Sequence, residues 1–318
     1  MNIFAADIGG TNSRFAHFEA DQKGELNLIK TLWLKTKEAP SFSSLLSDLK
    51  EKSFSLQPDQ AAIAVIAVAG PVERGVYSSP PFIAWSIDIS NARSDFGFKH
   101  CLLINDFVAQ AFACRSPIGR SAKQILSGTI APDSTAAVIG AGTGLGKAAL
   151  IPDGTGGFLA IPSEGGHTNF PFVSKKEFDF QNFLIRELGE VYITGNTVVS
   201  GRGISLLHLF LSGEKLEPKE VTSKLLPNTE TLKWAARFYG RVCRNYALET
   251  LSLGGLYVSG GVAARTPELI THEAFAAEFR SSPTMSKILE QIPVFLISNE
   301  ESGLWGAAVL GLQTLKKK

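Results

Sequence analysis

The chain has 318 residues, of which 44% are hydrophobic and 19% charged, and this is enough for about two globular domains. Its 31 lysines and arginines balance 30 aspartates and glutamates, so the net charge of +1 argues against the broad basic surface of a nucleic-acid-binding protein. No apolar run reaches the roughly 18 residues of a membrane span, the first residues lack a basic leader, and the three cysteines are scattered. We therefore expect a cytoplasmic protein without a membrane or nucleic-acid partner.

The first third of the chain alternates strands and helices. Apolar runs predict strands at residues 3–6, 13–18, 26–34, 61–68 and 101–104, and helical spacing predicts a helix at 41–49. Only a tight turn separates the first two strands, so we expect them to form an antiparallel hairpin and not a dinucleotide-binding unit. This order predicts an α/β fold whose sheet is antiparallel at one side and parallel within.

The same strand, glycine turn and strand arrangement occurs again in the middle of the chain. Strands are predicted at 136–139 and 147–151, with the glycine turn at 140–146 between them. A repeated supersecondary unit suggests two related domains with a cleft between them. A helix is then expected from Pro227, with Asn228 as its N-cap, followed by a strand at 256–259 and an apolar helix at 304–315.

The first glycine turn combines several groups that can bind a phosphate. Gly9 and Gly10 leave the backbone N–H groups open to an anion, and Thr11 and Asn12 can donate to its oxygens. Asp7 can hold a hydrated Mg²⁺ that neutralises the phosphates. The alternative is an ordinary turn in which Asp7 and Asn12 bond to their own backbone.

The second turn contains Gly142, Thr143 and Gly144. It is not a Walker loop, because Ala141 stands where the first glycine is required, and not a Rossmann fingerprint, because Leu145 stands where the third glycine is required. Its bare backbone also suits an anion, although glycine-rich hairpins are common for structural reasons alone.

A third turn, with Gly260 and Gly261, follows the strand at 256–259. Ligands of α/β proteins bind at the carboxyl ends of strands, so a ligand could rest against this backbone.

Two further segments place carboxylates where they could act on a ligand. Asn105 and Asp106 end an apolar strand, and Asp106 could accept the proton of a hydroxyl that attacks a γ-phosphoryl group. The alternative is that Asp106 is the N-cap of the following helix. Glu164 and His167 are separated by two glycines, and both can hydrogen-bond sugar hydroxyls. A zinc site is disfavoured, because no third ligand is evident.

Taken in order, the three turns resemble the first phosphate, second phosphate and adenosine motifs of the sugar kinase, actin and Hsp70 superfamily. More narrowly, the chain resembles bacterial glucokinases from about residue 3 to 312, with matching segments at 103–107, 164–167, 199–201 and 303–306. The resemblance implies a two-domain actin-like (ribonuclease H-like) ATPase fold with mixed sheets and an interdomain cleft. It also implies a small domain at 1–110, to which the C-terminal helix at 302–318 returns, and a large domain at 111–301.

The resemblance implies a function for each motif. We expect ATP-dependent phosphorylation of a hexose, foremost glucose to glucose 6-phosphate, with Asp106 as catalytic base. Asn105, Glu164 and His167 would orient the sugar, the first two turns and a Mg²⁺ near Asp7 would hold the phosphates, and Gly260 and Gly261 would lie beside the adenosine.

Two positions depart from the glucokinase pattern. Asn196 stands where the family carries a sugar-binding glutamate, and we expect it to be a weaker sugar ligand. The loop at 78–82 replaces a Thr-Asn-containing loop near the sugar. These departures keep two alternatives open, a kinase for another hexose and a non-catalytic sugar sensor. A homodimer is also possible.

Overall fold

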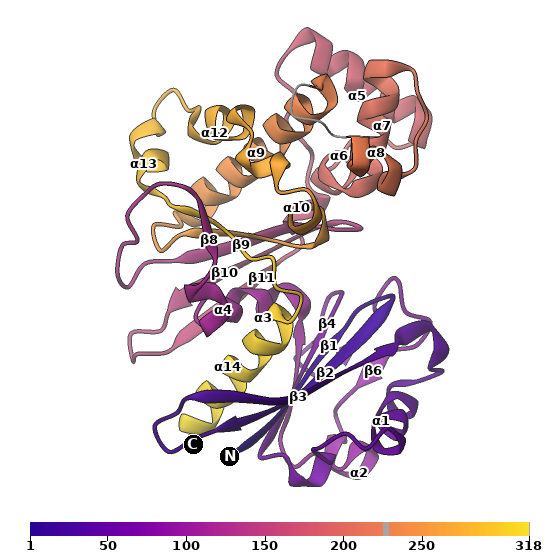
Figure 1. Cartoon of the computed structure of the whole chain (residues 1–318), viewed down its shortest axis with the longest axis vertical. Helices are drawn as coiled ribbons and strands as arrows, with labels where there is room; N and C mark the ends of the chain where they lie inside the picture. Colours follow the sequence, from indigo (N-terminus) through magenta and orange to yellow (C-terminus); the bar gives the residue numbers. More distant parts are fainter. Residues whose placement is uncertain (225–228, 318) are drawn as a thin grey trace. The chain divides into compact units, whose positions relative to one another are not determined.

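The computed structural model describes residues 1–224 and 229–317. The chain forms two compact units (Figure 1). The first comprises Met1–Ser121, Gly154–Pro162 and Asn299–Lys318, and the second comprises Ala122–Asp153 and Ser163–Ser298. The first unit is longer than the segment 1–110 with 302–318 expected from the sequence, because it also takes in α4 (Pro117–Arg120) and most of β11 (Phe158–Ser163).

The sheet of the first unit has five strands in the order β3-β2-β1-β4-β7. Their bounds are Leu26–Lys35, Asn12–Ala20, Asn2–Ile8, Ile63–Val68 and Cys101–Asn105 in that order. The pairs β1–β2 and β2–β3 are antiparallel, whereas β1–β4 and β4–β7 are parallel. The predicted hairpin and the predicted mixed sheet are both confirmed.

Both faces of this sheet are covered, because alternate residues of each strand point to opposite sides. On β1, Ile3 and Ala5 pack with Leu304 and Leu312 of helix α14 (Ser302–Lys316). Phe4 and its alternating neighbours belong to a second cluster with the apolar side of α1 (Phe42–Glu51). Figure 1 shows α14 lying along this sheet, so the C-terminal helix does return to the first unit.

The remaining elements of the first unit are short. They are η1 (Thr36–Glu38), η2 (Pro58–Gln60), β5 (Tyr77–Ser78), β6 (Ile87–Asp88), α2 (Ala92–Phe96) and α3 (Asp106–Ala113). Helix α3 packs closely on α14, where Gly306 leaves room for the backbone of Ala109.

The second unit is built on a sheet whose strands run β10-β9-β12-β13-β8. Their bounds are Leu145–Pro152, Ala136–Ala141, Leu256–Ser259, Val294–Leu296 and Lys123–Leu126 in that order. The β9–β10 hairpin is antiparallel, and β12 pairs in parallel with both β9 and β13. The second strand, turn and strand unit is therefore present as predicted.

Helices make up most of the rest of this unit. They are η3 (Gly165–His167), α5 (Lys175–Leu188), α6 (Gly195–Val199), α7 (Gly201–Ser212), α8 (Pro218–Lys224), α9 (Glu230–Thr250), α10 (Gly261–Arg265), α11 (Glu268–Thr271), α12 (Glu273–Arg280) and α13 (Ser286–Gln291). The apolar side of α9 shares one core with β9 and β12.

The start of α9 differs from the expectation. Asn228 lies outside the described residues, and the N-cap is Thr229, whose hydroxyl accepts from the N–H of Leu232. No helix among residues 1–224 and 229–317 is both long and apolar enough to cross a bilayer.

Candidate active site

The first unit gathers its candidate residues at one edge of its sheet. Strands β1, β4 and β7 are parallel, with Ile8 opposite Val68 and Val68 opposite Asn105. The turn after β1 and the Asn105-Asp106 pair after β7 therefore leave the sheet at the same edge. This carboxyl edge is where open α/β sheets bind their ligands.

The first glycine turn is held from outside by η1 and β3. The Thr36 hydroxyl donates to the carbonyl of Gly9 at 2.6 Å, and the Lys35 ammonium donates to Oδ1 of Asn12 at 2.9 Å. Within the described chain, no recorded hydrogen bond joins the side chain of Asp7 or Asn12 to the turn's own backbone. The alternative of a self-bonded turn is therefore wrong. The Thr11 side chain is exposed, in a position to meet a ligand.

The carboxylate of Asp7 is mostly buried and lies beside a cation. Its side chain is 13% exposed, and Oδ2 lies 3.3 Å from a guanidinium nitrogen of Arg14. Burial raises the pKa of Asp7, and the Arg14 charge and hydrogen bond offset this only in part. Three residues that contact this turn, Arg14, Lys35 and Thr36, were not predicted from the sequence. The register of the β2–β3 pair, which sets Asn12 opposite Lys35, is the signal that identifies one of them.

Asn105, and not Asp106, is the N-cap of helix α3. Oδ1 of Asn105 accepts from the N–H of Phe107 at 2.8 Å, and its amide donates to the carbonyl of Gly70 at 3.0 Å. Asp106 is the first helical residue, with Oδ1 2.9 Å from the N–H of Phe107. The alternative that Asp106 serves as the N-cap is wrong, and much of the hydrogen-bonding capacity of Asn105 is used inside the protein.

The loop at 78–82 reaches the same edge of the first unit. A Cβ on Gly10 would lie 2.9 Å from Cβ of Phe82, and a Cβ on Gly70 would lie 3.2 Å from Cα of Pro80. Gly70 in turn accepts from Asn105. The segment that departs from the glucokinase pattern thus packs on both the first turn and the Asn105 segment.

In the second unit the second glycine turn is tighter than expected. Strand β9 extends to Ala141 and β10 begins at Leu145, so only Gly142, Thr143 and Gly144 lie in the turn. The prediction of a turn from 140 to 146 was too wide, because antiparallel pairing continues through both flanking glycines. The N–H of Gly142 donates to the carbonyl of Gly144 at 2.8 Å, and Thr143 is exposed.

The third turn lies next to the second. Strand β12 pairs in parallel with β9, with Ser259 opposite Gly140. Gly260 has φ +88°, and a Cβ there would lie 2.7 Å from the carbonyl oxygen of Ala141. Both its conformation and this close approach require glycine. The structure thus brings Gly260 and Gly261 beside the turn at Gly142 on one sheet edge.

Asn196 joins the second turn to the loop that carries Glu164 and His167. Its Oδ1 accepts from the N–H of Leu145 at 2.6 Å. A Cβ on Gly144 would lie 3.2 Å from the same oxygen, and a Cβ on Gly166 would collide with it and with the carbonyl of Leu145. Asn196, which was expected to be a weaker sugar ligand, therefore already uses one acceptor position of Oδ1 inside the protein.

Glu164 and His167 lie together on the exposed side of η3. Nε2 of His167 is 3.7 Å from Oε2 of Glu164, and their side chains are 70% and 59% exposed. The structure brings together in the second unit Glu164, His167, Asn196 and the turns at Gly142 and Gly260. The interdomain cleft that would join them to Asp106 stays a prediction.

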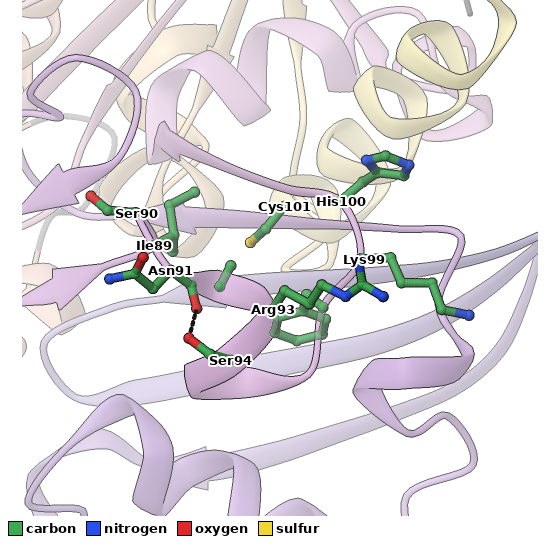
Figure 2. A pocket seen from close by; sticks show the side chains of 10 residues that line it. Ile89, Ser90, Asn91, Arg93, Ser94, Lys99, His100 and Cys101 are labelled. Carbon is green, nitrogen blue, oxygen red and sulfur yellow. Dashed lines mark hydrogen bonds between the residues drawn. The ribbon is translucent and has the colours of Figure 1, made fainter.

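Other features of the structure do not offer a rival site. Among the residues that the structure describes, no group of three or more His, Cys, Asp or Glu side chains could hold a metal ion. A hollow of about 750 Å³ lies in the first unit around α2, but it contains none of the candidate residues. Figure 2 shows Arg93, Lys99 and His100 around this hollow, with the Ser94 hydroxyl donating to the carbonyl of Asn91.

Comparison with known proteins agrees with this arrangement. The family described as Glucokinase matches residues 4–314. A glucokinase of Saccharophagus degradans is 33% identical over 314 residues, covering 95% of this chain and 96% of that protein. The chain belongs to the glucokinase family.

Solved structures show the same fold. A glucokinase from an Antarctic psychrotroph has a TM-score of 0.82 and 27% identity, covering 98% of this chain and 99% of that one. A ROK family glucokinase from Streptomyces griseus, in complex with glucose and AMPPNP, has a TM-score of 0.60 and 19% identity, covering 98% and 99%. The predicted two-domain, actin-like sugar kinase fold is confirmed. The chain is a hexokinase-type phosphotransferase, and the reaction of its family is the ATP-dependent phosphorylation of glucose.

Proposed function

We propose that the chain transfers the γ-phosphoryl group of ATP to the 6-hydroxyl of glucose, with Asp106 as the general base. The observation that carries this proposal is the placement of Asp106 and the first glycine turn at the carboxyl edge of the same sheet. Phosphoryl transfer needs a hydroxyl held in line with the phosphate and a carboxylate that accepts its proton. The rigid Asn105 cap fixes the start of α3 and so the backbone of Asp106.

The glycine turns would hold the nucleotide. Gly9 and Gly10 in the first unit, and Gly142 and Gly144 in the second, present backbone without side chains to the β- and γ-phosphates. Thr11, Asn12 and Thr143 would donate hydrogen bonds. Gly260 and Gly261 would lie beside the adenosine. The Streptomyces griseus protein of the same fold is in complex with glucose and AMPPNP, which supports the binding of a nucleotide and a sugar but does not place either of them.

The charges around Asp7 fit a hydrated Mg²⁺. The pKa of Asp7 is raised by burial, and Arg14, which also lies 3.6 Å from a carboxylate oxygen of Glu300, only partly offsets that burial. A divalent cation nearby would favour the ionised form. Asp7 would hold the ion through water while the phosphates supply its other ligands, and the ion would neutralise charge on the transferred group. Arg14 and Lys35 would add positive charge beside the first turn.

The sugar would be oriented by exposed side chains that have donors or acceptors left to offer. Glu164 and His167 form a pair that can accept from and donate to neighbouring hydroxyls. Asn105 and Asn196 would contribute the hydrogen-bonding capacity that their contacts inside the protein leave, since Oδ1 of each accepts one backbone N–H and the Asn105 amide also donates to Gly70. A cytoplasmic location and a possible homodimer stay predictions.

A coupled assay for ADP release tests the proposed function. We expect turnover with ATP and glucose that requires Mg²⁺ and stops on addition of EDTA. Mannose, fructose and N-acetylglucosamine, tested alongside, report how far the lost carboxylate at position 196 relaxes selectivity. Calorimetry of glucose binding in the same buffer separates the alternatives, since a sugar sensor would bind glucose without releasing ADP. Glucose binding without any turnover would overturn the proposal.

A further inference from the structure

Lys147 is a buried cation that the proposed reaction does not use. It lies on β10, directly after Gly146, and only 5% of it is exposed. Its ammonium nitrogen is 5.1 Å from the ring centroid of Tyr246. Among the described residues, no hydrogen bond or ion pair is recorded for this nitrogen, and Glu249 affects it only through longer-range charge.

The side chain of Lys147 lines a small cavity within the second unit. The cavity has a volume of about 120 Å³ and opens between exposed residues that include Thr168 and Glu249. Its inner wall includes Leu145, Phe170 and Lys147, which are all buried. Asn245 lines the same space, and because its Oδ1 accepts from Nε of Arg244 at 3.1 Å, its NH₂ group remains as a donor.

The ammonium group of Lys147 has three N–H donors, and no hydrogen bond to an oxygen is recorded for it among the described residues. The stem of the side chain is buried while the nitrogen reaches the cavity, so water or a ligand in the cavity has to accept from these donors. Burial lowers the pKa of Lys147, and the charge of Glu249 raises it again in part. The cavity is therefore lined by a charged hydrogen-bond donor, the Lys147 ammonium group, and by a neutral donor, the NH₂ group of Asn245.

We propose that this cavity binds a small oxyanion of the inorganic phosphate class, with Lys147 as its charged donor and Asn245 as its neutral one. The size of the cavity limits the ligand: 120 Å³ is about four times the roughly 30 Å³ that a water occupies, which suits one tetrahedral anion. Pockets that bind drug-sized ligands have volumes of about 300–1,000 Å³, so this cavity is too small for a whole nucleotide.

The cavity lies against the loop that carries the proposed sugar ligands. A Cβ on Gly165 would lie 3.3 Å from Cδ and 3.4 Å from Nζ of Lys147, and Gly165 itself lines the cavity. An anion there would contact the segment between Glu164 and His167 and change the apparent affinity for sugar. This link to sugar rests on the proposed function, whereas the binding of the anion does not.

Calorimetric titration of the full chain with inorganic phosphate tests the proposal. Saturating AMPPNP and Mg²⁺ are kept present so that the proposed phosphate turns are occupied, and nucleotide binding is measured separately. We expect Lys147→Met to weaken phosphate binding about tenfold or more, because it removes the charged donor and keeps an unbranched apolar stem. Glu249→Gln should strengthen binding about threefold, because it removes a negative charge from the cavity mouth.

The control is Lys175→Met, which removes an exposed lysine of the same unit and should leave phosphate binding unchanged. Thermal unfolding of each variant shows whether it folds. Three outcomes would each overturn the proposal. The first is no phosphate binding in the presence of AMPPNP, and the second is equal phosphate binding by wild type and folded Lys147→Met. The third is a phosphate affinity that neither Glu249→Gln nor Lys147→Met changes from the wild-type value. If ordered water alone occupies the cavity, the titration will show no phosphate binding, which is the first of these outcomes.

Discussion

Oδ1 of Asn196 accepts a hydrogen bond from the N–H of Leu145 at 2.6 Å, and through it the second glycine turn is tied to the loop of Glu164 and His167. Asn196, a position that departs from the glucokinase pattern, therefore forms a brace between two parts of the candidate site.

Replacing Asn196 tests this brace. Asn196→Ala leaves the Leu145 N–H without its acceptor, a loss of about 1–3 kcal/mol that should lower the thermal midpoint and reduce kcat/KM about tenfold or more. Asn196→Asp keeps the acceptor, so the thermal midpoint should recover. The new charge lies beside Gly144 and should still raise KM for ATP. If Asn196 served sugar alone, neither variant would change KM for ATP.

Gly142 offers a test of the phosphate site that does not disturb the fold. No heavy atom lies within 4 Å of a Cβ built there, and its φ is not in the left-handed region. Gly142→Ala should therefore keep the thermal midpoint, yet raise KM for ATP about tenfold, because the methyl group keeps the phosphate from the backbone.

Gly166→Ala is the contrasting variant, because its methyl group would collide with Leu145 and Asn196. It should lower the thermal midpoint and activity together. An unchanged KM for ATP in Gly142→Ala would contradict a phosphate contact at that turn.

The hairpins and the central buried strands were predictable from the sequence, whereas strands β8, β11 and β13 and the side-chain partners at the site were not. Unbroken apolar runs such as 61–68 and 256–259 identify buried strands because only a sheet core accepts them. The glycines in the turns indicated where side chains leave the backbone N–H groups uncovered. Nothing local, however, pairs Asn196 with Leu145, which are far apart in sequence and meet only through tertiary packing.

The N-cap of α3 shows, within a short segment, the limit of what can be predicted from the sequence. Asn105 and Asp106 are both good N-cap residues, and the sequence does not say which one begins the helix. The pairing of Asn105 with Val68 extends β7 by one residue beyond the predicted strand. The hydrogen bond from the Asn105 side-chain amide to the carbonyl of Gly70 then fixes Asn105 as the cap. Tertiary contacts thus decide which of the two side chains caps the helix.

Asp106→Asn tests the proposed base. Asparagine cannot accept the hydroxyl proton, so kcat should fall by about 10²–10⁴ while glucose affinity measured by calorimetry stays within about threefold. The loss of stability should be small, because asparagine keeps an Oδ1 that can accept from the Phe107 N–H and loses the favourable charge in the first turn of α3. Asp95→Asn, in the first turn of the short helix α2, is the control and should keep full turnover. A kcat near wild type in Asp106→Asn would remove Asp106 from the mechanism.

The stability of the second unit should depend on pH through Glu177. This carboxylate on α5 is 1% exposed and lies within hydrogen-bond distance of Arg241 on α9 and Arg237. Burial alone would raise its pKa, but hydrogen bonds from Arg241 and the Val173 N–H, with the charges of both arginines, hold the pKa of Glu177 below its usual range. Its contribution is therefore full above the unfolded pKa of about 4.3 and is lost as pH falls through the lower folded value.

Glu177→Gln should accordingly lower the free energy of unfolding by about 3 kcal/mol at pH 7, because Arg241 stays buried with only Glu278 as a charged partner. The difference from wild type should narrow as the pH is lowered below about 4, where the wild-type carboxylate also gains a proton. Denaturant unfolding from pH 7 to pH 3.5 measures both effects, and comparison with Glu187→Gln, an exposed position on α5, removes the general acid response. If the difference in the free energy of unfolding between wild type and Glu177→Gln stayed constant from pH 7 to pH 3.5, the charge of Glu177 would not be what stabilises the unit.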